Sequence, residues 1–228
     1  MTLQSTKNLP VQTTVLIYGA AKIGKTWLAT QCPSPVIACI DRGVSSLREF
    51  DLPFDTINSF ADLNDRFFND CLTAPYKKQF KTIIIDDLCA LADMFLVAEK
   101  PRHKDPRKAY FELSDAILAF LHKFNTLAEQ HGYFVVYLCK ETKVVEAMTG
   151  LTLTAPMVPG KAIGPMLPYL VGEVWHMELW LDPTDNQLKR VFRTKRNNAV
   201  DAGSRYGKFG ELEYANLTSL FERMKSGS

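Results

Sequence analysis

The eight residues 19–26, which read GAAKIGKT, constrain the fold more than any other part of the chain. They match the pattern G-x-x-x-x-G-K-[ST] in full, and the apolar, β-branched run 13–19 (TTVLIYG) leads into them. Such a run predicts a buried strand, and the residues after the motif predict a helix as far as about Gln31. A strand, a glycine-rich turn and a helix in this order direct successive backbone N–H groups at a bound anion, next to the positive end of the helix.

The motif therefore predicts a phosphate site, and each of its positions is a candidate nucleotide ligand. These positions are Gly19, Ala20, Ala21, Lys22, Ile23, Gly24, Lys25 and Thr26. Lys25 is expected to bridge the β- and γ-phosphates, as a catalytic as well as a binding residue, and the Thr26 hydroxyl is expected to ligate Mg²⁺.

A second motif, the run 83–87 (IIIDD), predicts a buried strand that ends in acids. Asp86 in this run is the second candidate metal residue, since a strand-end carboxylate can hold a metal-bound water beside the phosphates. The chain contains no N-K-x-D sequence for reading guanine, which favours ATP over GTP. ATP and Mg²⁺ are thus the expected cofactors.

Apolar runs continue to alternate with helical patterns up to about residue 140. The strand-like runs are 36–40, 54–57, 81–85 and 133–139, and the helical segments are 61–72, 88–99 and 108–131. Continuous apolar strands separated by helices predict an α/β fold, with a mostly parallel sheet covered by helices on both faces.

Beyond residue 140 the pattern changes. Segment 142–165 is rich in Thr, Gly, Pro and Met without a sustained period, which predicts a long, mobile loop. The runs 173–182 and 187–196, joined by Pro-Thr-Asp-Asn, predict a hairpin, and a helix is expected over 211–225. The predicted organisation is a flexible leader, residues 1–11, followed by one domain, residues 12–228.

Composition excludes several classes of protein. With 46% hydrophobic and 23% charged residues, the chain is neither disordered nor fibrous. It has no apolar run of membrane-spanning length and no signal-peptide pattern, so we expect a cytoplasmic protein without a membrane partner. Its five cysteines form no C-x-x-C pair and are expected to be reduced core residues rather than zinc ligands.

The formal net charge of +2 conceals a segregation of charge. Segment 100–108 carries five bases and one acid, and segment 189–208 carries seven bases and one acid. The rest of the chain then has 15 bases against 23 acids, a net charge of −8. Concentrated positive charge of this kind suits a polyanion, either a nucleotide or a nucleic acid, although solvated loops can show it too.

In the order of its motifs the chain resembles RecA-type ATPases, and more closely the compact phage-encoded RecA-like proteins of recombination and single-strand annealing. The resemblance covers about residues 11–208. It rests on the phosphate loop, a strand ending in Ile40-Asp41, the IIIDD run, a long helix, a strand ending in YLCK at residues 137–140, an irregular loop and a hairpin that ends in bases.

This resemblance implies a RecA-like P-loop core with a C-terminal β-hairpin extension. It also implies an ATP-binding and ATP-hydrolysing protein that binds single-stranded DNA and promotes recombination or annealing, in a host cytoplasm if phage-encoded. The implied partners are single-stranded DNA, further copies of the chain in a ring or filament, and a single-strand binding protein.

The resemblance also assigns roles to residues outside the phosphate loop. Lys140 would sense the γ-phosphate, although a strand-end lysine can equally be a solvated one. The irregular segment, residues 141–165, would contact DNA through Lys143 and Lys161. Lys195 and Arg196 would enter the ATP site of a neighbouring subunit, where cations stabilise charge on the transferring phosphoryl group.

The sequence departs from the family where a catalytic glutamate is expected. Asp41 is followed by Arg-Gly-Val, and no glutamate follows Asp86 directly. Asp87 is therefore the first candidate for polarising the attacking water and Asp41 the second. Hydrolysis is expected to be slow or stimulated by DNA.

Two other functions fit parts of the pattern. A small-molecule or nucleotide kinase could use the basic run 100–108 as a phosphate-clamping lid. A loader accessory protein of the AAA+ type is the third reading, although the strand-rich C-terminal part differs from the helical lid domain that such proteins carry.

Overall fold

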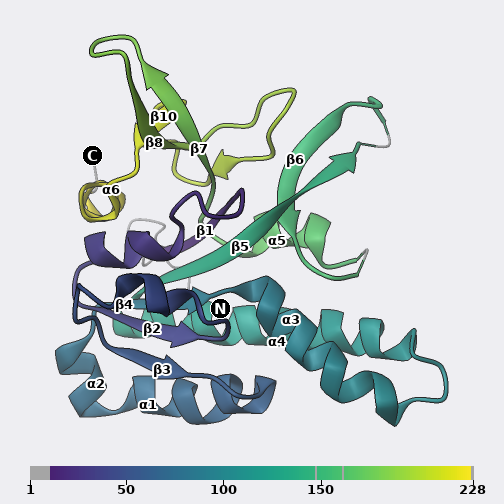
Figure 1. The fold of residues 1–228 in the computed structure, drawn as a ribbon. Helices are drawn as coiled ribbons and strands as arrows, with labels where there is room; N and C mark the ends of the chain where they lie inside the picture. The colour runs from purple at the N-terminus through teal and green to yellow at the C-terminus, as the bar shows by residue number, and fades with distance from the viewer. Residues whose placement is uncertain (1–10, 147, 161, 227–228) are drawn as a thin grey trace, which may run out of the picture.

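The computed structural model describes residues 11–146, 148–160 and 162–226, and is built around a ten-stranded sheet (Figure 1). The strands follow the order β10-β8-β7-β1-β5-β4-β2-β3, and β6 pairs with β5 while β9 pairs with β7. Their bounds are β1 Thr14–Gly19, β2 Pro35–Cys39, β3 Phe54–Thr56, β4 Thr82–Asp86, β5 Phe134–Val145, β6 Thr152–Met157, β7 Glu173–Asp182, β8 Gln187–Arg193, β9 Gly203–Ser204 and β10 Leu212–Tyr214.

Helices connect these strands. The α-helices are α1 Phe68–Leu72, α2 Ala74–Gln79, α3 Leu88–Glu99, α4 Lys108–His131, α5 Leu167–Leu170 and α6 Leu217–Lys225. Short 3₁₀ helices are η2 Thr26–Gln31, η3 Gly43–Leu47, η5 Lys100–Arg102 and η6 Gly164–Met166, and η4 Asp62–Phe67 is π-helical. Among the described residues, none of these helices combines the length and apolar character needed to cross a membrane.

Strands β1, β2, β3, β4, β5 and β7 are paired in parallel, so their carboxyl ends meet at one edge of the sheet. Along β1, Leu16 and Tyr18 join the apolar cluster that includes α3 and α4. Val15 and Ile17 join the opposite cluster, which includes η2 and α6. Both faces of the parallel sheet are therefore covered, which confirms the predicted fold class.

The segment predicted as an irregular loop, 141–165, is largely a β-hairpin, so that prediction was wrong. β5 continues to Val145 and pairs antiparallel with β6, from Lys140 opposite Met157 to Val145 opposite Thr152. Pro156 concealed β6 in the sequence, because proline lacks the N–H that a sheet ladder uses and argues against an interior strand. β6 pairs with β5 along its length. Among the described residues, it also forms an isolated β-bridge, between Thr154 and Val200.

Other boundaries differ more modestly. The helix after the phosphate motif is the six-residue 3₁₀ helix η2, and β8 ends at Arg193 rather than at 196. The helix expected over 211–225 begins only at Leu217, because the Asn216 side chain caps it by accepting from the Ser219 N–H at 3.2 Å. Helices α3 and α4 and strand β7 occupy the expected segments. All five cysteines are buried and free, as predicted.

Glu173, the first residue of β7, is a buried carboxyl that fastens β9 to the sheet. Its Oε1 accepts a hydrogen bond from Ser204 Oγ at 2.8 Å, and its Oε2 accepts one from Trp175 Nε1 at 3.0 Å. Burial raises the pKa of Glu173 from 4.5 to about 7, although these hydrogen bonds favour the ionised form.

We therefore predict that the free energy of unfolding falls between pH 4.5 and 7, because the unfolded chain loses the Glu173 proton before the native state does. The expected loss of unfolding free energy is on the order of 3 kcal/mol and is complete above pH 7. The variant Glu173→Gln, which has no proton to lose here, should not show it. Urea unfolding at pH 5 and pH 8 checks it. The difference in unfolding free energy between wild type and variant isolates the contribution of Glu173. If this difference is the same at both pH values, the assignment is contradicted.

Candidate nucleotide-binding site

The phosphate loop connects the end of β1 to the start of η2, as the motif predicts. Lys25 Nζ donates hydrogen bonds to the carbonyl oxygens of Gly19 and Ala20, each at 2.8 Å. Burial lowers the pKa of Lys25, and the carboxylates of Asp87 and Asp86 partly offset this effect. The ammonium group is thus held inside the loop, where phosphate oxygens can replace its two carbonyl partners.

The candidate metal residues, Thr26 and Asp86, meet beside this loop. Thr26 Oγ1 donates to Asp86 Oδ2 at 2.8 Å. Burial raises the pKa of Asp86 to about 7, and the nearby charges of Asp41 and Asp87 add to the shift, while the Thr26 hydrogen bond opposes it. Hydroxyl and carboxylate oxygens are the ligands that Mg²⁺ prefers, and a divalent cation would relieve the repulsion among the acids. These residues therefore fit a magnesium ion.

Gly43, which the sequence analysis did not assign, completes this cradle. Its N–H donates to Asp41 Oδ1 at 2.7 Å. A Cβ at this position would lie 2.8 Å from Asp41 Oδ1, 3.1 Å from Thr26 Oγ1 and 3.2 Å from Asp86 Oδ2. The three oxygens thus converge on space that a side chain would fill. A glycine two residues after a strand-end aspartate was the available signal.

Asp87 and Lys140 face each other at the same edge of the sheet. Asp87 Oδ1 caps α3 by accepting from the Ala90 N–H at 2.6 Å, and Asp87 Oδ2 lies 4.0 Å from Lys140 Nζ. Burial raises the pKa of Asp87. The Lys140 side chain is half exposed; its partial burial disfavours the charged form, but Asp87 and other acidic groups raise its pKa overall. The structure therefore brings Lys25, Asp87 and Lys140 into one charged neighbourhood.

Arg190 on β8 is a second residue that the sequence analysis missed. Its Nε donates to the Ile23 carbonyl oxygen at 2.8 Å, and its guanidinium carbon lies 5.5 Å from the ring centroid of Trp27. A Cβ at Gly24, whose φ is +104°, would lie 2.9 Å from Arg190 Nε. The contact with the Ile23 carbonyl therefore braces the phosphate loop against β8. In the sequence, Arg190 is one of seven bases in segment 189–208, and nothing in the pattern singles it out.

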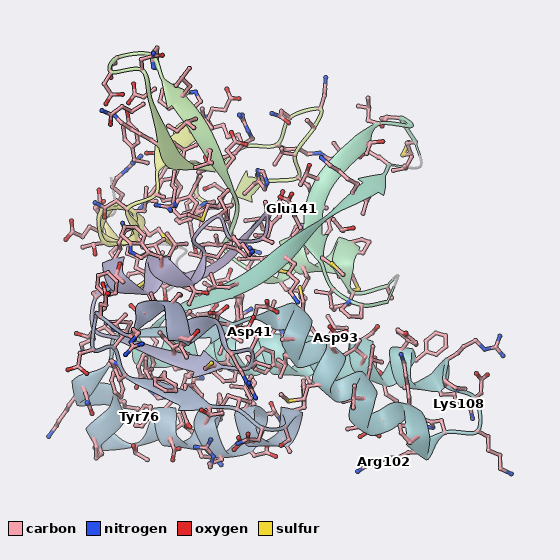
Figure 2. All side chains as sticks on the ribbon, viewed as in Figure 1. Asp41, Tyr76, Asp93, Arg102, Lys108 and Glu141 are labelled. Atoms are coloured by element: carbon pink, nitrogen blue, oxygen red, sulfur yellow. The ribbon has the colours of Figure 1, made fainter. Side chains whose placement is uncertain are left out.

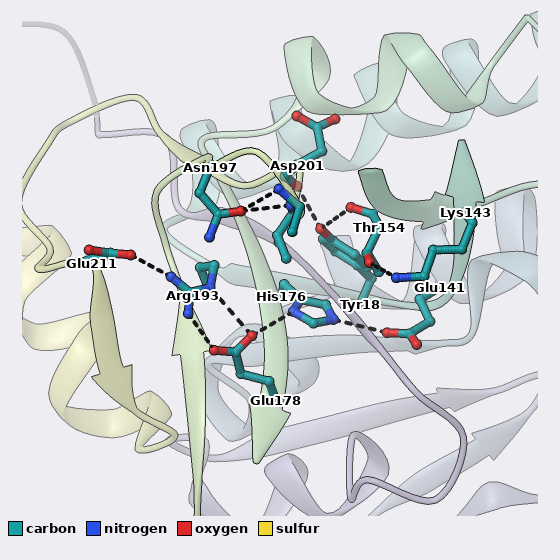
Figure 3. Close-up of polar contacts among 12 residues, drawn as sticks. Tyr18, Glu141, Lys143, Thr154, His176, Glu178, Arg193, Asn197, Asp201 and Glu211 are labelled. Carbon is teal, nitrogen blue, oxygen red and sulfur yellow. Dashed lines mark hydrogen bonds and ion pairs between the residues drawn. The ribbon is translucent and has the colours of Figure 1, made fainter. Parts of the chain in front are cut away.

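A polar network lies around Tyr18 and His176 (Figure 3). The Tyr18 hydroxyl, one residue before the loop, lies 2.7 Å from the Asp201 carbonyl oxygen and 3.0 Å from that of Thr154. His176 on β7 lies between two carboxylates, 2.9 Å from Glu141 Oε2 and 3.3 Å from Glu178 Oε2. These contacts connect the strand that leads into the loop with the β5–β6 hairpin.

The other predicted residues lie away from the loop contacts described above. Lys143 on β5 donates to Thr154 Oγ1 at 2.6 Å. Arg196 pairs with Glu146, at the far end of the β5–β6 hairpin, and lies 3.8 Å from Asp201; Lys195 beside it is exposed. Lys161 lies outside the described residues. The roles of these residues toward DNA or a neighbouring subunit stay predictions.

We predict that Gly43→Ala weakens nucleotide binding in Mg²⁺ about tenfold or more, because the new methyl group displaces Asp41, Thr26 or Asp86 from the shared oxygen cradle. Titration of ADP with Mg²⁺ and with EDTA checks it, and the loss should appear with Mg²⁺. Gly203→Ala is the matched control, since a Cβ at Gly203 meets nothing within 4 Å. Equal losses with and without Mg²⁺ would contradict a role for Gly43 in the cradle.

We further predict that Arg190→Ala weakens ADP binding about fivefold, the equivalent of about 1 kcal/mol or one typical hydrogen bond, because the loop loses its brace against β8. Arg190→Lys should restore the affinity only in part, since an ammonium group lacks the planar guanidinium that lies over the Trp27 ring. Calorimetric titration measures both variants against Arg48→Ala, an exposed arginine on another segment. Wild-type affinity in Arg190→Ala would show that the contact does not support the loop.

Comparisons with protein families and with solved structures found proteins similar to this chain. The sequence model of a family described as an AAA domain matches residues 12–206. Solved structures that resemble the chain include a KaiC-like protein from the archaeon Pyrococcus horikoshii, with 18% identity, a TM-score of 0.44, and 81% of this chain and 78% of that chain covered. Another is a RadB recombinase, with 15% identity, a TM-score of 0.49, and 81% and 80% covered.

Curated protein sequences gave no significant match. The AAA-domain match spans the phosphate loop, Asp86 and the strands that position them. The chain belongs to this AAA-domain family.

Proposed function

We propose that the protein binds and hydrolyses ATP with Mg²⁺, and couples this to binding single-stranded DNA in recombination or strand annealing. The observation that carries the ATPase part is the convergence of Lys25, Thr26 and Asp86 at the carboxyl edge of the parallel sheet. We further propose that the chain assembles with other copies of itself, interacts with a single-strand binding protein and is of phage origin. These three proposals rest on the resemblance of its motif order to that of RecA-type ATPases.

The chemistry follows from what each group can do. The loop N–H groups and Lys25 would neutralise the β- and γ-phosphates, and Thr26 and Asp86 would hold Mg²⁺, which supplies charge neutralisation at the phosphates. Asp87 lies beside Lys140 with a raised pKa, so it can accept a proton from an attacking water. Asp41 stays the second candidate for this step, and Lys140 remains the candidate contact to the γ-phosphate.

The geometry gives less support to a small-molecule kinase. In that reading the basic run 100–108 is a lid over the phosphates. α3 has 12 residues and begins directly after Asp87, so it carries this run about 18 Å along its axis from the site. An AAA+-type loader is also less supported, because the described C-terminal residues 173–226 supply strands β7 to β10 and α6 instead of a helical lid domain.

ATP turnover measured with and without oligo(dT) tests the proposal. We expect slow hydrolysis that the oligonucleotide stimulates, and binding to the oligonucleotide that weakens steeply with salt. Lys25→Ala should abolish turnover and reduce ATP affinity by at least about a hundredfold, since the phosphate charge loses the cation held in the loop. Lys78→Ala, a lysine exposed on α2, is the control.

Each part of the proposal can fail separately. Undiminished ATP binding in Lys25→Ala would overturn the loop assignment. Turnover and binding indifferent to oligo(dT) would leave an ATPase but remove the DNA function. Phosphoryl transfer to a nucleoside monophosphate would instead favour the kinase.

A further inference from the structure

Helices α3 and α4 pack against each other and run away from the sheet to the segment that joins them (Figure 1). Residues 99–112, which we call the α3–α4 junction, comprise the end of α3, η5, a loop and the start of α4. Arg102 and Lys108 mark the junction in Figure 2. It lies about 18 Å from Asp87, since α3 begins directly after Asp87 and has 12 residues. The junction is therefore separate from the nucleotide site.

Three side chains of the α3–α4 junction bring metal-ligating atoms together. Glu99 ends α3, His103 follows η5, and Glu112 lies near the start of α4. One ligand atom of each lies within 4.8 Å of the other two, and His103 Nε2 lies 2.8 Å from Glu112 Oε2. Among the residues that the structure describes, this is the one group of three or more His, Cys, Asp or Glu side chains that meets so closely. Three segments thus supply one ligand each.

The charge of this cluster is incompletely balanced. The side chains of Glu99 and His103 are each 20% exposed, and that of Glu112 is 47% exposed. The two carboxylates repel each other at this separation. Arg102 pairs with Glu99 at 2.9 Å, but the Arg102 side chain is 70% exposed, and an exposed pair of this kind contributes little stability. A cation bound between the carboxylates would relieve their repulsion and displace Arg102.

The lysines of the junction leave the cluster accessible to such a cation. Although residues 100–108 carry five bases, no lysine ammonium lies within 4.0 Å of a carboxylate oxygen of Glu99 or Glu112 among the described residues. Arg107 pairs with Asp105 instead, at 2.8 Å. The positive charge of the bases still opposes binding of any cation. This opposition favours an ion that forms strong bonds to its ligands over one that is held by charge alone.

The donor set indicates which ion fits. Imidazole nitrogen suits Zn²⁺ and neighbouring transition-metal ions, whereas Mg²⁺ and Ca²⁺ take oxygen ligands. Zn²⁺ is often held by three protein ligands and a water, and ligand atoms in such a tetrahedron lie about 3.4 Å apart. Small side-chain rotations would bring the cluster to this spacing. Pro101 and Pro106 fix φ on either side of His103, which reduces the conformational freedom that binding must remove.

We propose that Glu99, His103 and Glu112 bind a divalent transition-metal ion of the zinc class, with water completing its coordination. The ion links the end of α3 to the start of α4 and restrains the loop between them. The ion pairs of these three side chains stay within the junction, so the site goes beyond the ATP and DNA functions proposed above. Either can fail without the other.

Calorimetric titration with ZnCl₂ tests the site, in excess Mg²⁺ to compete at the oxygen ligands of the nucleotide site. Wild type should bind Zn²⁺, and both His103→Ala and Glu99→Gln/Glu112→Gln should bind it at least about tenfold more weakly. Loss of an outer-shell partner alone costs about 10- to 100-fold in metal affinity, so loss of a ligand costs at least as much. Co²⁺ bound to wild type should show the visible absorption of a tetrahedral site, and His103→Ala should lack it.

His122→Ala and Glu129→Gln are the matched controls, because they remove the same types of side chain from exposed positions elsewhere on α4. Both should bind Zn²⁺ like wild type. Without Zn²⁺, all variants should unfold cooperatively on heating and keep the wild-type ADP affinity in Mg²⁺, which shows that they are folded. The proposal is overturned if wild type binds no Zn²⁺, if the junction variants bind it as tightly as wild type, or if the controls weaken binding equally. None of these outcomes bears on the ATP or DNA function.

Discussion

The register of the parallel strands decides which groups meet at the site. Pairing of β1 with β5 sets Gly19 beside Lys140, and pairing of β1 with β7 sets it beside Met177. Pairing of β2 with β4 sets Cys39 beside Asp86, so that Asp41 follows at the same level. A shift of one residue in any of these pairs would turn alternate side chains to the other face and separate the phosphate loop from its acids.

The site that results is electrostatically unfavourable without a ligand. Asp86 and Asp87 are buried beside Asp41, and burial raises the pKa of both buried carboxyls. Lys25 is held at the same time by carbonyl oxygens, with its own pKa lowered. A nucleotide with Mg²⁺ supplies the missing charges of both signs, which gives a physical reason for binding the two together. Such groups with perturbed pKa values in one cleft are typical of functional sites.

The sequence predicted the parts of the fold that local patterns specify. The phosphate motif, the apolar strands and the long amphipathic helix α4 each carry their signal within a short window. β6 was missed because its pattern is short and contains Pro156, and its partner β5 runs past the buried core into exposed residues. Gly43 and Arg190 were missed for another reason: their roles depend on contacts across the sheet and with the loop. The sequence offers only weak local signals for them, a glycine two residues after Asp41 and one base in a basic segment.

The sequence predicted where the basic residues are concentrated, but not which of them contact the phosphate loop or pair with acids. The sequence showed two basic segments, whereas the structure shows that many of their bases are paired locally, as Arg193 is with Glu178 and Glu211. Only the fold distinguishes Arg190, which contacts the phosphate loop, from Lys108, which Figure 2 shows away from the sheet, near the junction of α3 and α4. Counting bases along the chain therefore overestimates the charge that remains for a nucleic acid.

The central claim is that the phosphate loop and the strand-end oxygens form one site for a nucleotide and its metal. A crystal structure with ADP and Mn²⁺, whose anomalous signal locates the ion, tests it most directly. The account predicts the β-phosphate within the loop formed by residues 19–26, and the ion bonded to the Thr26 hydroxyl on the side of Asp86. Phosphates bound outside the loop, or an ion distant from Thr26 and Asp86, would contradict it.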